Sequence, residues 1–243
     1  MNNKFKKLKE LIAKSNNIIF FGGAGVSTES GIPDFRSKDG LYNQKYKYPP
    51  EYILSHECWL ENPEEFYEFY KEKMNCLDAN PNITHYALAK LEEIGKITCV
   101  ITQNIDGLHQ KAGSKNVAEL HGSIYRNYCT KCKKKYEAKY VFESDNIPKC
   151  ECGGVIKPDV VLYGEFLKDA TVRNIKEAIK ECDLLIVGGT SLSVYPAAFF
   201  VEFNTKNVVI INRDETDYDD KATLVINDSL GNVFAEIMKE YKV

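Results

Sequence analysis

The chain has 243 residues, of which 44% are hydrophobic and 28% are charged, a composition that excludes disordered, collagen-like and fibrous proteins. This length suits one large domain or a domain with an insert, and about 70–75% of the unfolded surface becomes buried when such a chain folds. The formal net charge of −3 excludes a global positive field, so we expect no specific nucleic-acid partner and no binding to an anionic membrane.

The longest apolar runs are too short for a membrane span. Leu184–Val187 and Val208–Ile211 fall far below the roughly 20 residues that a spanning helix needs. No apolar stretch of signal-peptide length follows the lysines of Met1–Leu11. We therefore expect a cytoplasmic protein whose eight cysteines are reduced thiols.

Short apolar runs alternate with helical patterns along most of the chain. Phe5–Ser15 has apolar residues at helical spacing, and Asn17–Phe21 is a continuous apolar run that ends at a glycine turn. The same patterns predict further strands and helices at Pro63–Met74, Pro81–Ile94, Ile97–Thr102, Asp169–Glu181, Asp183–Val187, Asn207–Ile211 and Val233–Tyr241. Strands that alternate with helices predict an α/β fold with a parallel sheet covered on both faces.

Two segments interrupt this alternation, and we interpret them as inserts that form a smaller module beside the sheet. Residues 37–80 are rich in Tyr, Phe, Glu and Pro, and residues 124–158 hold a group of cysteines and lysines with almost no apolar periodicity. The predicted sheet domain then comprises residues 1–36, 81–123 and 159–243.

Four of the eight cysteines lie within the second insert, as Cys-x2-Cys, seventeen residues, and Cys-x-Cys. Four thiolates on two short turns can surround one zinc ion at about 2.3 Å per bond, and metal binding would supply the folding free energy that such a polar segment lacks. Because no histidine lies nearby, a closed structural site is favoured over a catalytic one. The predicted zinc ligands are Cys129, Cys132, Cys150 and Cys152.

The glycine turn Gly23-Ala-Gly25 follows the first predicted strand. Such a turn lets the backbone approach a pyrophosphate closely. Thr28 replaces the third glycine of the dinucleotide-binding pattern, so a tight turn without a ligand is the alternative. The residues that end this region favour a ligand, because Arg36 can pair with a phosphate in a bidentate manner and Phe35 can cover a ring.

Polar side chains follow other predicted strands, where open parallel sheets bind their ligands. Thr102–His109 contains amide and carboxylate side chains, and Gly188–Ser191 ends a further strand. His121 lies at the junction between the sheet domain and the cysteine module, where a cleft is expected. The other three histidines have no such context, and we expect packed or solvated rings at His56, His85 and His109.

Taken together and in order, these motifs resemble those of the sirtuins, which are NAD-dependent protein lysine deacylases. The resemblance runs from about Asn17 to Tyr195 and continues loosely to the end. The matching pieces are Gly23-Ala-Gly-Val-Ser27, Gly31-Ile-Pro-Asp-Phe-Arg36, Thr102-Gln-Asn-Ile-Asp-Gly-Leu-His109, Leu120-His-Gly122, the four cysteines and Lys157-Pro-Asp-Val-Val-Leu-Tyr-Gly-Glu165. The resemblance implies a Rossmann-type domain, a small zinc module and a substrate cleft between them.

The implied reaction transfers an acetyl group from lysine to ADP-ribose, with NAD+ as co-substrate. The acyl oxygen attacks the ribose carbon that bears nicotinamide, and the products are free lysine, nicotinamide and O-acetyl-ADP-ribose. By the resemblance His121 is the general base, Asn104 positions the ribose or its water, and Phe35 shields the reacting carbon. The residues implied to bind the cofactor are Gly23, Ala24, Gly25, Thr28, Asp34, Phe35, Arg36, Gln103, Asn104, Ile105, Asp106, His121, Gly189, Thr190, Ser191, Asn212, Ser229 and Leu230.

The resemblance also implies how an acetyl-lysine peptide binds. The peptide would pair as an extra strand between the backbone of Gly189–Tyr195 and that of a second segment, which gives affinity with little sequence choice. That second segment comprises Val160, Val161, Leu162, Tyr163 and Gly164.

The same resemblance bears on the choice of acyl group. Relatives that prefer acidic acyl groups share a Tyr-x-x-Arg pair. The corresponding segment of this chain is Tyr67-Glu-Phe-Tyr70, in which the arginine is missing. We therefore expect a preference for acetyl and other uncharged acyl groups.

Four other functions remain open from the sequence. With the same cofactor, the chain could transfer ADP-ribose to protein or hydrolyse NAD+. It could also be a zinc-bearing module that binds NAD+ without catalysis. A nucleic-acid-binding zinc ribbon is a further alternative because Lys131–Lys135 is basic, although such a run is usually a solvated face. We expect a monomer.

Overall fold

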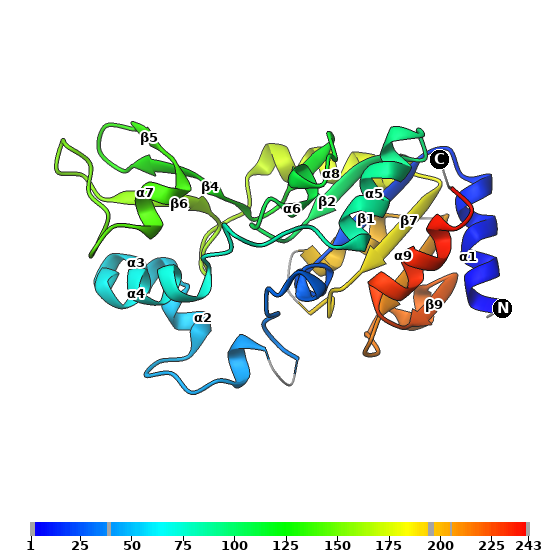
Figure 1. Cartoon of the computed structure of the whole chain (residues 1–243), viewed down its shortest axis with the longest axis horizontal. Coiled ribbons are helices and arrows are strands. Elements are labelled where there is room, and N and C mark those ends of the chain that lie inside the picture. The colour runs from blue at the N-terminus through cyan, green and yellow to red at the C-terminus, as the bar shows by residue number, and fades with distance from the viewer. Residues whose placement is uncertain (1–2, 38–39, 194–196, 205, 242–243) are drawn as a thin grey trace.

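The computed structural model describes residues 3–37, 40–193, 197–204 and 206–241. The chain forms a large sheet domain and a smaller module, which lie at opposite ends of its longest axis (Figure 1). None of the described helices is both long and apolar enough to cross a membrane.

The sheet domain contains six parallel strands in the order β3-β2-β1-β7-β8-β9. This is the doubly wound order of Rossmann-type folds, in which the chain builds outward from β1 and then returns to build outward from β7. The strands are β1 (Ile18–Gly22), β2 (Ile97–Thr102), β3 (Val117–Glu119), β7 (Leu184–Gly188), β8 (Asn207–Asn212) and β9 (Leu224–Asn227). The four predicted strands are confirmed to within one residue at either end. The edge strands β3 and β9 were not predicted, because they have only three and four residues.

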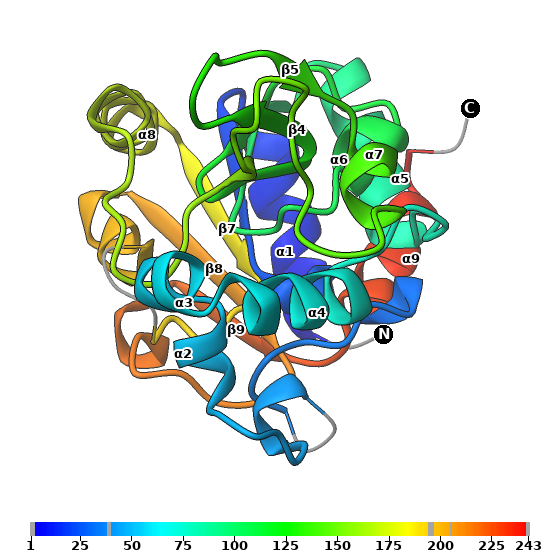
Figure 2. The same cartoon turned by 90° about the vertical axis from the view of Figure 1, so that its left-hand side faces the viewer.

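Successive side chains of the central strands point to opposite faces, and each face has its own core. Ile18 and Phe20 pack on one face beneath α1 (Asn3–Lys14), α5 (Ile83–Glu93) and α9 (Leu230–Met238). Ile19 and Phe21 pack on the other beneath α8 (Asp169–Glu181) and the 3-10 segment η4 (Ala197–Phe203). Figure 2 shows α8 on one side of the sheet and α5 and α9 on the other.

Side-chain caps fix where two of these helices begin. Asn82 caps α5, since its Oδ1 accepts the N–H of Thr84 at 2.9 Å while His85 Nδ1 accepts the N–H of Asn82 at 3.2 Å. Ser229 caps α9 by accepting the N–H of Asn232 at 3.2 Å. Because of this cap α9 begins three residues before the predicted start at Val233.

The smaller module combines short helices with an antiparallel sheet in the order β5-β4-β6. Its elements are α2 (Pro50–Ile53), α3 (His56–Glu61), α4 (Pro63–Lys73), β4 (Gly122–Cys129), β5 (Lys135–Tyr136), α7 (Ala138–Phe142) and β6 (Ile156–Val160). The short helix α6 (Leu108–Lys111) packs against α5 of the sheet domain. A third core joins Phe66 and Tyr70 of α4 to Ile124 and Ile156 of the sheet. The predicted division of the chain at 36/37, 80/81, 123/124 and 158/159 remains a prediction, and β4 and β6 both cross its boundaries.

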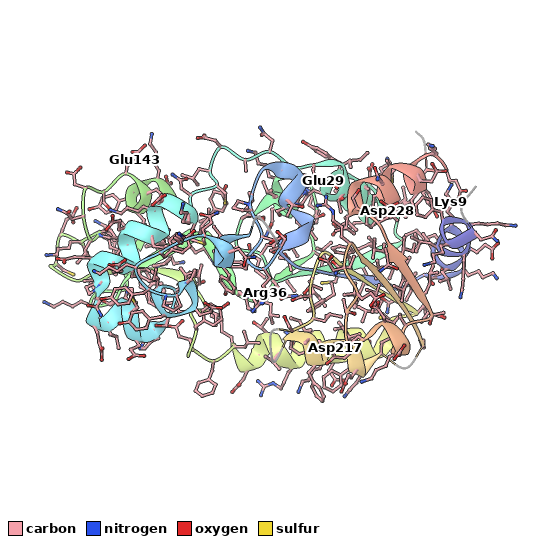
Figure 3. The ribbon with its side chains drawn as sticks, turned by 90° about the horizontal axis from the view of Figure 1, so that it is seen from below. Lys9, Glu29, Arg36, Glu143, Asp217 and Asp228 are labelled. Carbon is pink, nitrogen blue, oxygen red and sulfur yellow. The ribbon has the colours of Figure 1, made fainter. Side chains whose placement is uncertain are left out.

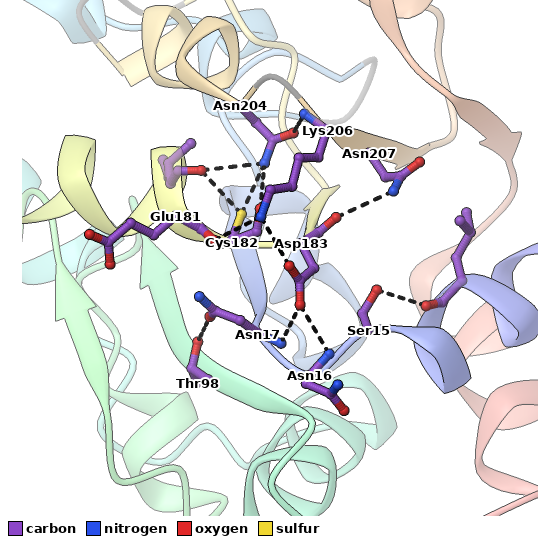
Figure 4. Close-up of polar contacts among 12 residues, drawn as sticks. Ser15, Asn16, Asn17, Thr98, Glu181, Cys182, Asp183, Asn204, Lys206 and Asn207 are labelled. Carbon is purple, nitrogen blue, oxygen red and sulfur yellow. Dashed lines mark hydrogen bonds and ion pairs between the residues drawn. The ribbon is translucent and has the colours of Figure 1, made fainter.

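A polar cluster lies where β1 and β7 begin, at the edge of the sheet opposite to their carboxyl ends (Figure 4). Asp183 Oδ2 accepts the N–H groups of Asn16 and Asn17, both at 3.2 Å, and Asp183 Oδ1 pairs with Lys206 Nζ at 3.0 Å. The hydrogen bond and charge of Lys206, together with these N–H groups, hold the pKa of Asp183 below its ordinary value. The cluster joins the connections that precede β1, β7 and β8.

Candidate active site

A cavity of about 470 Å³ lies at the carboxyl ends of β1 and β7, where the strand order reverses. This is the position at which doubly wound sheets bind their ligands, and the volume is within the usual range for a ligand site. The cavity extends beneath the smaller module, whose α4 contributes Tyr70 and Lys73 to its wall. The residues that were implied to bind cofactor or peptide and that line this cavity are Ala24, Gly25, Thr28, Asp34, Phe35, Arg36, Gln103, Asn104, Ile105, Asp106, His121, Val160, Val161, Leu162, Tyr163, Gly164, Gly189, Thr190, Ser191, Asn212, Ser229 and Leu230.

Gly23 is the one residue of the implied cofactor set that does not line the cavity, because it packs against a second turn. A Cβ atom at Gly23 would lie 2.7 Å from Thr190 Cβ, and one at Gly25 would lie 2.8 Å from Gly189 Cα. The N–H of Gly25 donates to the carbonyl of Gly189 at 2.8 Å. The two turns can therefore pack against each other only if these positions are glycine. This leaves backbone at the cavity floor, which fits the diphosphate of NAD+.

Three side chains from two turns form a buried hydrogen-bonded chain. Ser27 Oγ donates to Asp106 Oδ2 at 2.7 Å and accepts from Asn104 Nδ2 at 3.1 Å. Asp106 Oδ1 accepts the N–H of Leu108 at 2.8 Å, which starts α6. Burial raises the pKa of Asp106 above its ordinary value, although the bonds from Ser27 and Leu108 oppose the shift. These hydrogen bonds fix the directions of the Asn104 amide and the Asp106 carboxyl group.

His121 lies just before β4, at the junction between the two parts of the protein. Its Nδ1 is 2.9 Å from the carbonyl oxygen of Gln103. A carbonyl only accepts, so Nδ1 carries the proton and Nε2 of the neutral ring is left with a free lone pair. Burial lowers the pKa of His121 despite the opposing bond to Gln103, which favours this neutral form. The ring can therefore accept a proton within the cavity.

The loop after the glycine turn carries an aromatic ring and a cation to the cavity. The ring of Phe35 lies edge-on to that of Tyr42, with centroids 5.5 Å apart. Arg36 is exposed and lies between the module and the sheet domain (Figure 3). Asp34 Oδ1 accepts the N–H groups of Arg36 and Ser37, at 3.1 and 2.8 Å, so this carboxylate holds the shape of the loop.

The backbone of the implied peptide segment is already used in part. Tyr163 donates its N–H to Leu54 and accepts from His56, while both backbone groups of Leu162 are paired with Glu165. The carbonyl of Val161 and both backbone groups of Gly164 have no partner in the described residues. These are the positions at which an added strand can pair. Tyr195, at the end of the second implied segment, lies outside the described residues.

Helix α4 places the two tyrosines named in the acyl expectation in different surroundings, and the expectation itself stays a prediction. Tyr67 does not line the cavity, because its hydroxyl donates to the carbonyl of Ile156 at 2.7 Å and accepts from Trp59 Nε1 at 3.0 Å. The residues one helical turn apart that face the cavity are Tyr70 and Lys73. The Tyr70 hydroxyl is buried without a partner in the described residues. The arginine is absent, as expected, and the cation that lines the cavity is Lys73, whose Nζ pairs with Glu72 at 2.8 Å.

The sequence interpretation missed several residues of the site. Ser27 was quoted within a motif without a role, although it joins Asn104 to Asp106. No sequence signal points to the end of α4. The neighbours of Asn212 and Ser229 could have been predicted, because a polar run follows Asn212 at the end of β8 and Asp228 directly precedes Ser229. Missed residues that line the cavity include Ser27, Glu29, Tyr70, Lys73, Met74, Cys76, Arg213, Asp214, Glu215 and Asp228.

The other histidines lie outside the cavity. His85 and His109 are fully buried, with ring centroids 4.8 Å apart, and burial lowers their pKa values to about 4 and about 3. His56 Nδ1 lies 2.8 Å from Glu165 Oε1. His85 and His109 are packed rings, as the sequence predicts, whereas His56 is partly buried and paired with Glu165.

The four cysteines predicted as metal ligands come together at one end of the smaller module. Their Sγ atoms all lie within 4.8 Å of one another, and two pairs, Cys129–Cys152 and Cys132–Cys150, are 3.5 Å apart. Tetrahedral zinc with 2.3 Å bonds needs sulfur atoms about 3.8 Å apart, so the cluster fits this ion. A Cβ atom at Gly154 would lie 2.5 Å from Cys129 Sγ, so the turn can pass the cluster only as glycine.

Comparisons with known proteins agree with this geometry. Residues 23–196 match the model of the Sir2 family. An NAD-dependent protein deacetylase of Clostridium perfringens is 56% identical over 98% of this chain and 100% of its own length. A solved structure of Sir2 with a deacetylated p53 peptide and 3′-O-acetyl-ADP-ribose is 41% identical, with a TM-score of 0.90 and 98% of each chain covered. A structure of Sir2 bound to acetylated peptide is 40% identical, with a TM-score of 0.87 and 98% of each chain covered. The chain belongs to the Sir2 family and is an NAD-dependent protein deacetylase.

Proposed function

We propose that this cavity removes acetyl groups from lysine side chains of proteins by transferring them to ADP-ribose, with His121 and Asn104 as the catalytic residues. When bound, NAD+ would supply the ribose carbon that the acetyl oxygen attacks as nicotinamide leaves, and the ribose hydroxyl that finally carries the acetyl group. The observation that carries the proposal is the convergence of the Asn104 amide, the buried Asp106 and the His121 ring in one cavity.

The residues of the glycine turn bind and orient the cofactor. The backbone at Ala24 and Gly25, with Thr28 and Arg36, holds the diphosphate. Gln103 Nε2 donates to Thr190 Oγ1 at 3.1 Å. This bond joins the turn after β2 to the turn after β7, and these two turns hold the riboses. Thr190, Ser191 and Asn212 hold the adenosine half with Ser229 and Leu230. Ile105 and Asp106 hold the nicotinamide amide.

The catalytic side chains position groups and move one proton. Asn104, oriented by Ser27, holds the ribose or its water. The free Nε2 of His121 accepts a proton from a ribose hydroxyl, because Nδ1 is held by Gln103. Phe35 excludes water from the reacting carbon. The acetyl-lysine peptide pairs with the free backbone groups of Val161 and Gly164.

The four cysteines would hold one zinc ion that stabilises the turns of the smaller module and takes no part in the chemistry. The setting that we propose is a monomer in the cytoplasm that acts on acetylated proteins. The acetylated peptide bound in the structure of a relative supports this class of substrate.

Labelled NAD+ tests the proposed reaction against its two closest alternatives. Nicotinamide release that requires an acetyl-lysine peptide is expected. Release without peptide would indicate an NAD+ hydrolase, and label retained on protein would indicate ADP-ribosyl transfer. A module that only binds NAD+ would release no nicotinamide under either condition.

A further inference from the structure

In the described part of the loop that carries Phe35 and Arg36, one hydroxyl pair makes a hydrogen bond to the rest of the protein. Within residues 34–46, backbone bonds such as Leu41 N–H to Asp34 O at 2.9 Å and Tyr42 N–H to Phe35 O at 2.8 Å stay inside the loop. Among the described residues of this loop, the hydrogen bond that reaches outside it joins the hydroxyl of Tyr42 to that of Tyr163. The other anchors are apolar or aromatic contacts, such as that of buried Leu41.

The ring of Tyr42 contacts both side chains that are proposed to face the cofactor, those of Phe35 and Arg36. Its ring meets the ring of Phe35 at a centroid distance of 5.5 Å and an angle of 60°. The guanidinium carbon of Arg36 lies 5.2 Å from the centre of the same ring. A change in the position of Tyr42 therefore moves both the group that covers the reacting carbon and the group that faces the diphosphate.

Tyr163 belongs to the segment proposed to pair with the peptide. Its N–H donates to the carbonyl of Leu54 at 3.0 Å, and its own carbonyl accepts the N–H of His56 at 2.9 Å. The next residue, Gly164, keeps both backbone groups free for an added strand. The hydroxyl of Tyr163 has a partner in the cofactor loop, the hydroxyl of Tyr42.

We propose that the Tyr42–Tyr163 hydroxyl pair couples binding of the acetyl-lysine peptide to binding of the cofactor, with Tyr163 as a positioning residue that acts through Tyr42 on Phe35 and Arg36. A peptide strand paired at Gly164 restricts the motion of Tyr163 and, through the hydroxyl pair, that of the loop. The cofactor then binds to a loop that is already ordered, so each ligand strengthens the binding of the other. The inference rests on the proposed function.

Calorimetry with ADP-ribose tests the coupling, because this ligand carries the diphosphate and cannot react. Its Kd is measured with and without saturating acetyl-lysine peptide, and the ratio is the coupling factor. The full chain is compared with Tyr163→Phe, Tyr42→Phe and the double variant. Tyr140→Phe is the matched control, because it removes an exposed hydroxyl that donates to Lys149 O at 2.9 Å far from the cavity.

The peptide is expected to tighten ADP-ribose binding in the unmodified protein and in Tyr140→Phe. Loss of one hydrogen bond should reduce the coupling factor by about threefold to tenfold in each single variant. The double variant should lose no more than either single one, because both substitutions remove the same bond. By reciprocity the peptide affinity should show the same loss of coupling.

A coupling factor of one in the unmodified protein, or an unchanged factor in Tyr163→Phe, would overturn the inference. Additive losses in the double variant would also overturn it, because they would place the two hydroxyls in separate interactions. Peptide-dependent nicotinamide release is measured on the same preparations. Its absence would contradict the proposed function itself, whereas its presence with unchanged coupling would contradict only the role of the hydroxyl pair.

Discussion

Ser27 and Asp106 are joined by a buried hydrogen bond of 2.7 Å, although 79 positions separate them in the chain. Ser27 lies on the turn after β1, and Asp106 lies on the turn after β2, so the bond links two neighbouring strand ends at the cavity. The same serine hydroxyl accepts from Asn104, and one side chain thus fixes both the amide and the carboxyl group.

Substitution of Ser27 should therefore reduce activity through loss of the hydrogen bonds that orient Asn104 and Asp106. Ser27→Ala removes one buried and one partly buried hydrogen bond, each with a net contribution of about 0.5–1.5 kcal/mol. We expect kcat/KM to fall about tenfold to a hundredfold, on the scale of 1.4 kcal/mol for each factor of ten. Steady-state kinetics with an acetyl-lysine peptide measure the effect, and Ser30→Ala, on the same loop, is the control. Equal kinetics in the two variants would contradict the assigned role of Ser27.

The pH dependence of the reaction should follow the His121 ring. Burial lowers the pKa of His121 below the ordinary value of 6.5, and only the neutral ring can accept a proton. Activity is therefore retained down to a pH below 6.5 and is lost as the pH falls through the lowered pKa. The acid limb of kcat/KM measures this value. An acid limb above pH 6.5 would exclude His121 as the titrating base.

Replacement of His121 separates catalysis from binding. His121→Tyr should abolish turnover and leave NAD+ binding within a few-fold of the unmodified value, since the diphosphate contacts lie on the glycine turn. Calorimetry measures the binding, and nicotinamide release measures the turnover. Retained turnover would show that another group accepts the proton.

The acyl preference tests the electrostatics at the end of α4. Because Lys73 is already paired with Glu72, a succinyl carboxylate in the cavity gains little from that cation and loses its hydration. Acetyl peptide should react more efficiently than a matched succinyl peptide by a factor of about ten or more. Glu72→Gln should free Lys73 and narrow the ratio, while Glu68→Gln, which is exposed on the same helix, should leave it unchanged. Comparable efficiencies in the unmodified protein would refute the preference.

Metal content should follow the four clustered cysteines. We expect about one zinc ion per chain, which is lost together with activity in Cys129→Ser or Cys150→Ser because the module then loses part of its folding free energy. Cys99→Ser, outside the cluster, should keep both. Metal analysis and the deacetylation rate give the two readouts. Full activity in a zinc-free cluster variant would contradict a structural role for the metal.

The buried histidine pair should make stability depend on pH. The folded pKa values of His85 and His109 are about 4 and about 3, below the unfolded value of 6.5. Their contribution to stability is therefore fully present above pH 6.5 and is lost as the pH falls through the folded values. His85→Asn keeps an acceptor near the N–H of Asn82, and the free energy of unfolding should fall less steeply between pH 6.5 and 4 than in the unmodified protein. Urea unfolding at several pH values tests this, and equal slopes would contradict it.

The sequence predicts those features that rest on local patterns. Continuous apolar runs such as Ile97–Thr102 are recognisable because both faces of a central parallel strand are buried. The cysteine spacing predicts the metal cluster because two short turns are enough to form it. Short edge strands such as β9 carry too few residues for a pattern.

The contacts that the sequence could not predict are those between distant segments. Tyr67 and Tyr70 have the same local pattern, and only the packing of α4 against β6 decides which of them lines the cavity. The partner of the Tyr163 hydroxyl likewise depends on how the loop after the glycine turn folds back.

The most direct test of the central claim is the product balance of a reaction with NAD+ and an acetyl-lysine peptide, followed by mass spectrometry. The proposed mechanism predicts one nicotinamide and one O-acetyl-ADP-ribose for each lysine that is freed, and none of the three with His121→Tyr. Free acetate with ADP-ribose as the initial products, or equal turnover by the His121 variant, would contradict it.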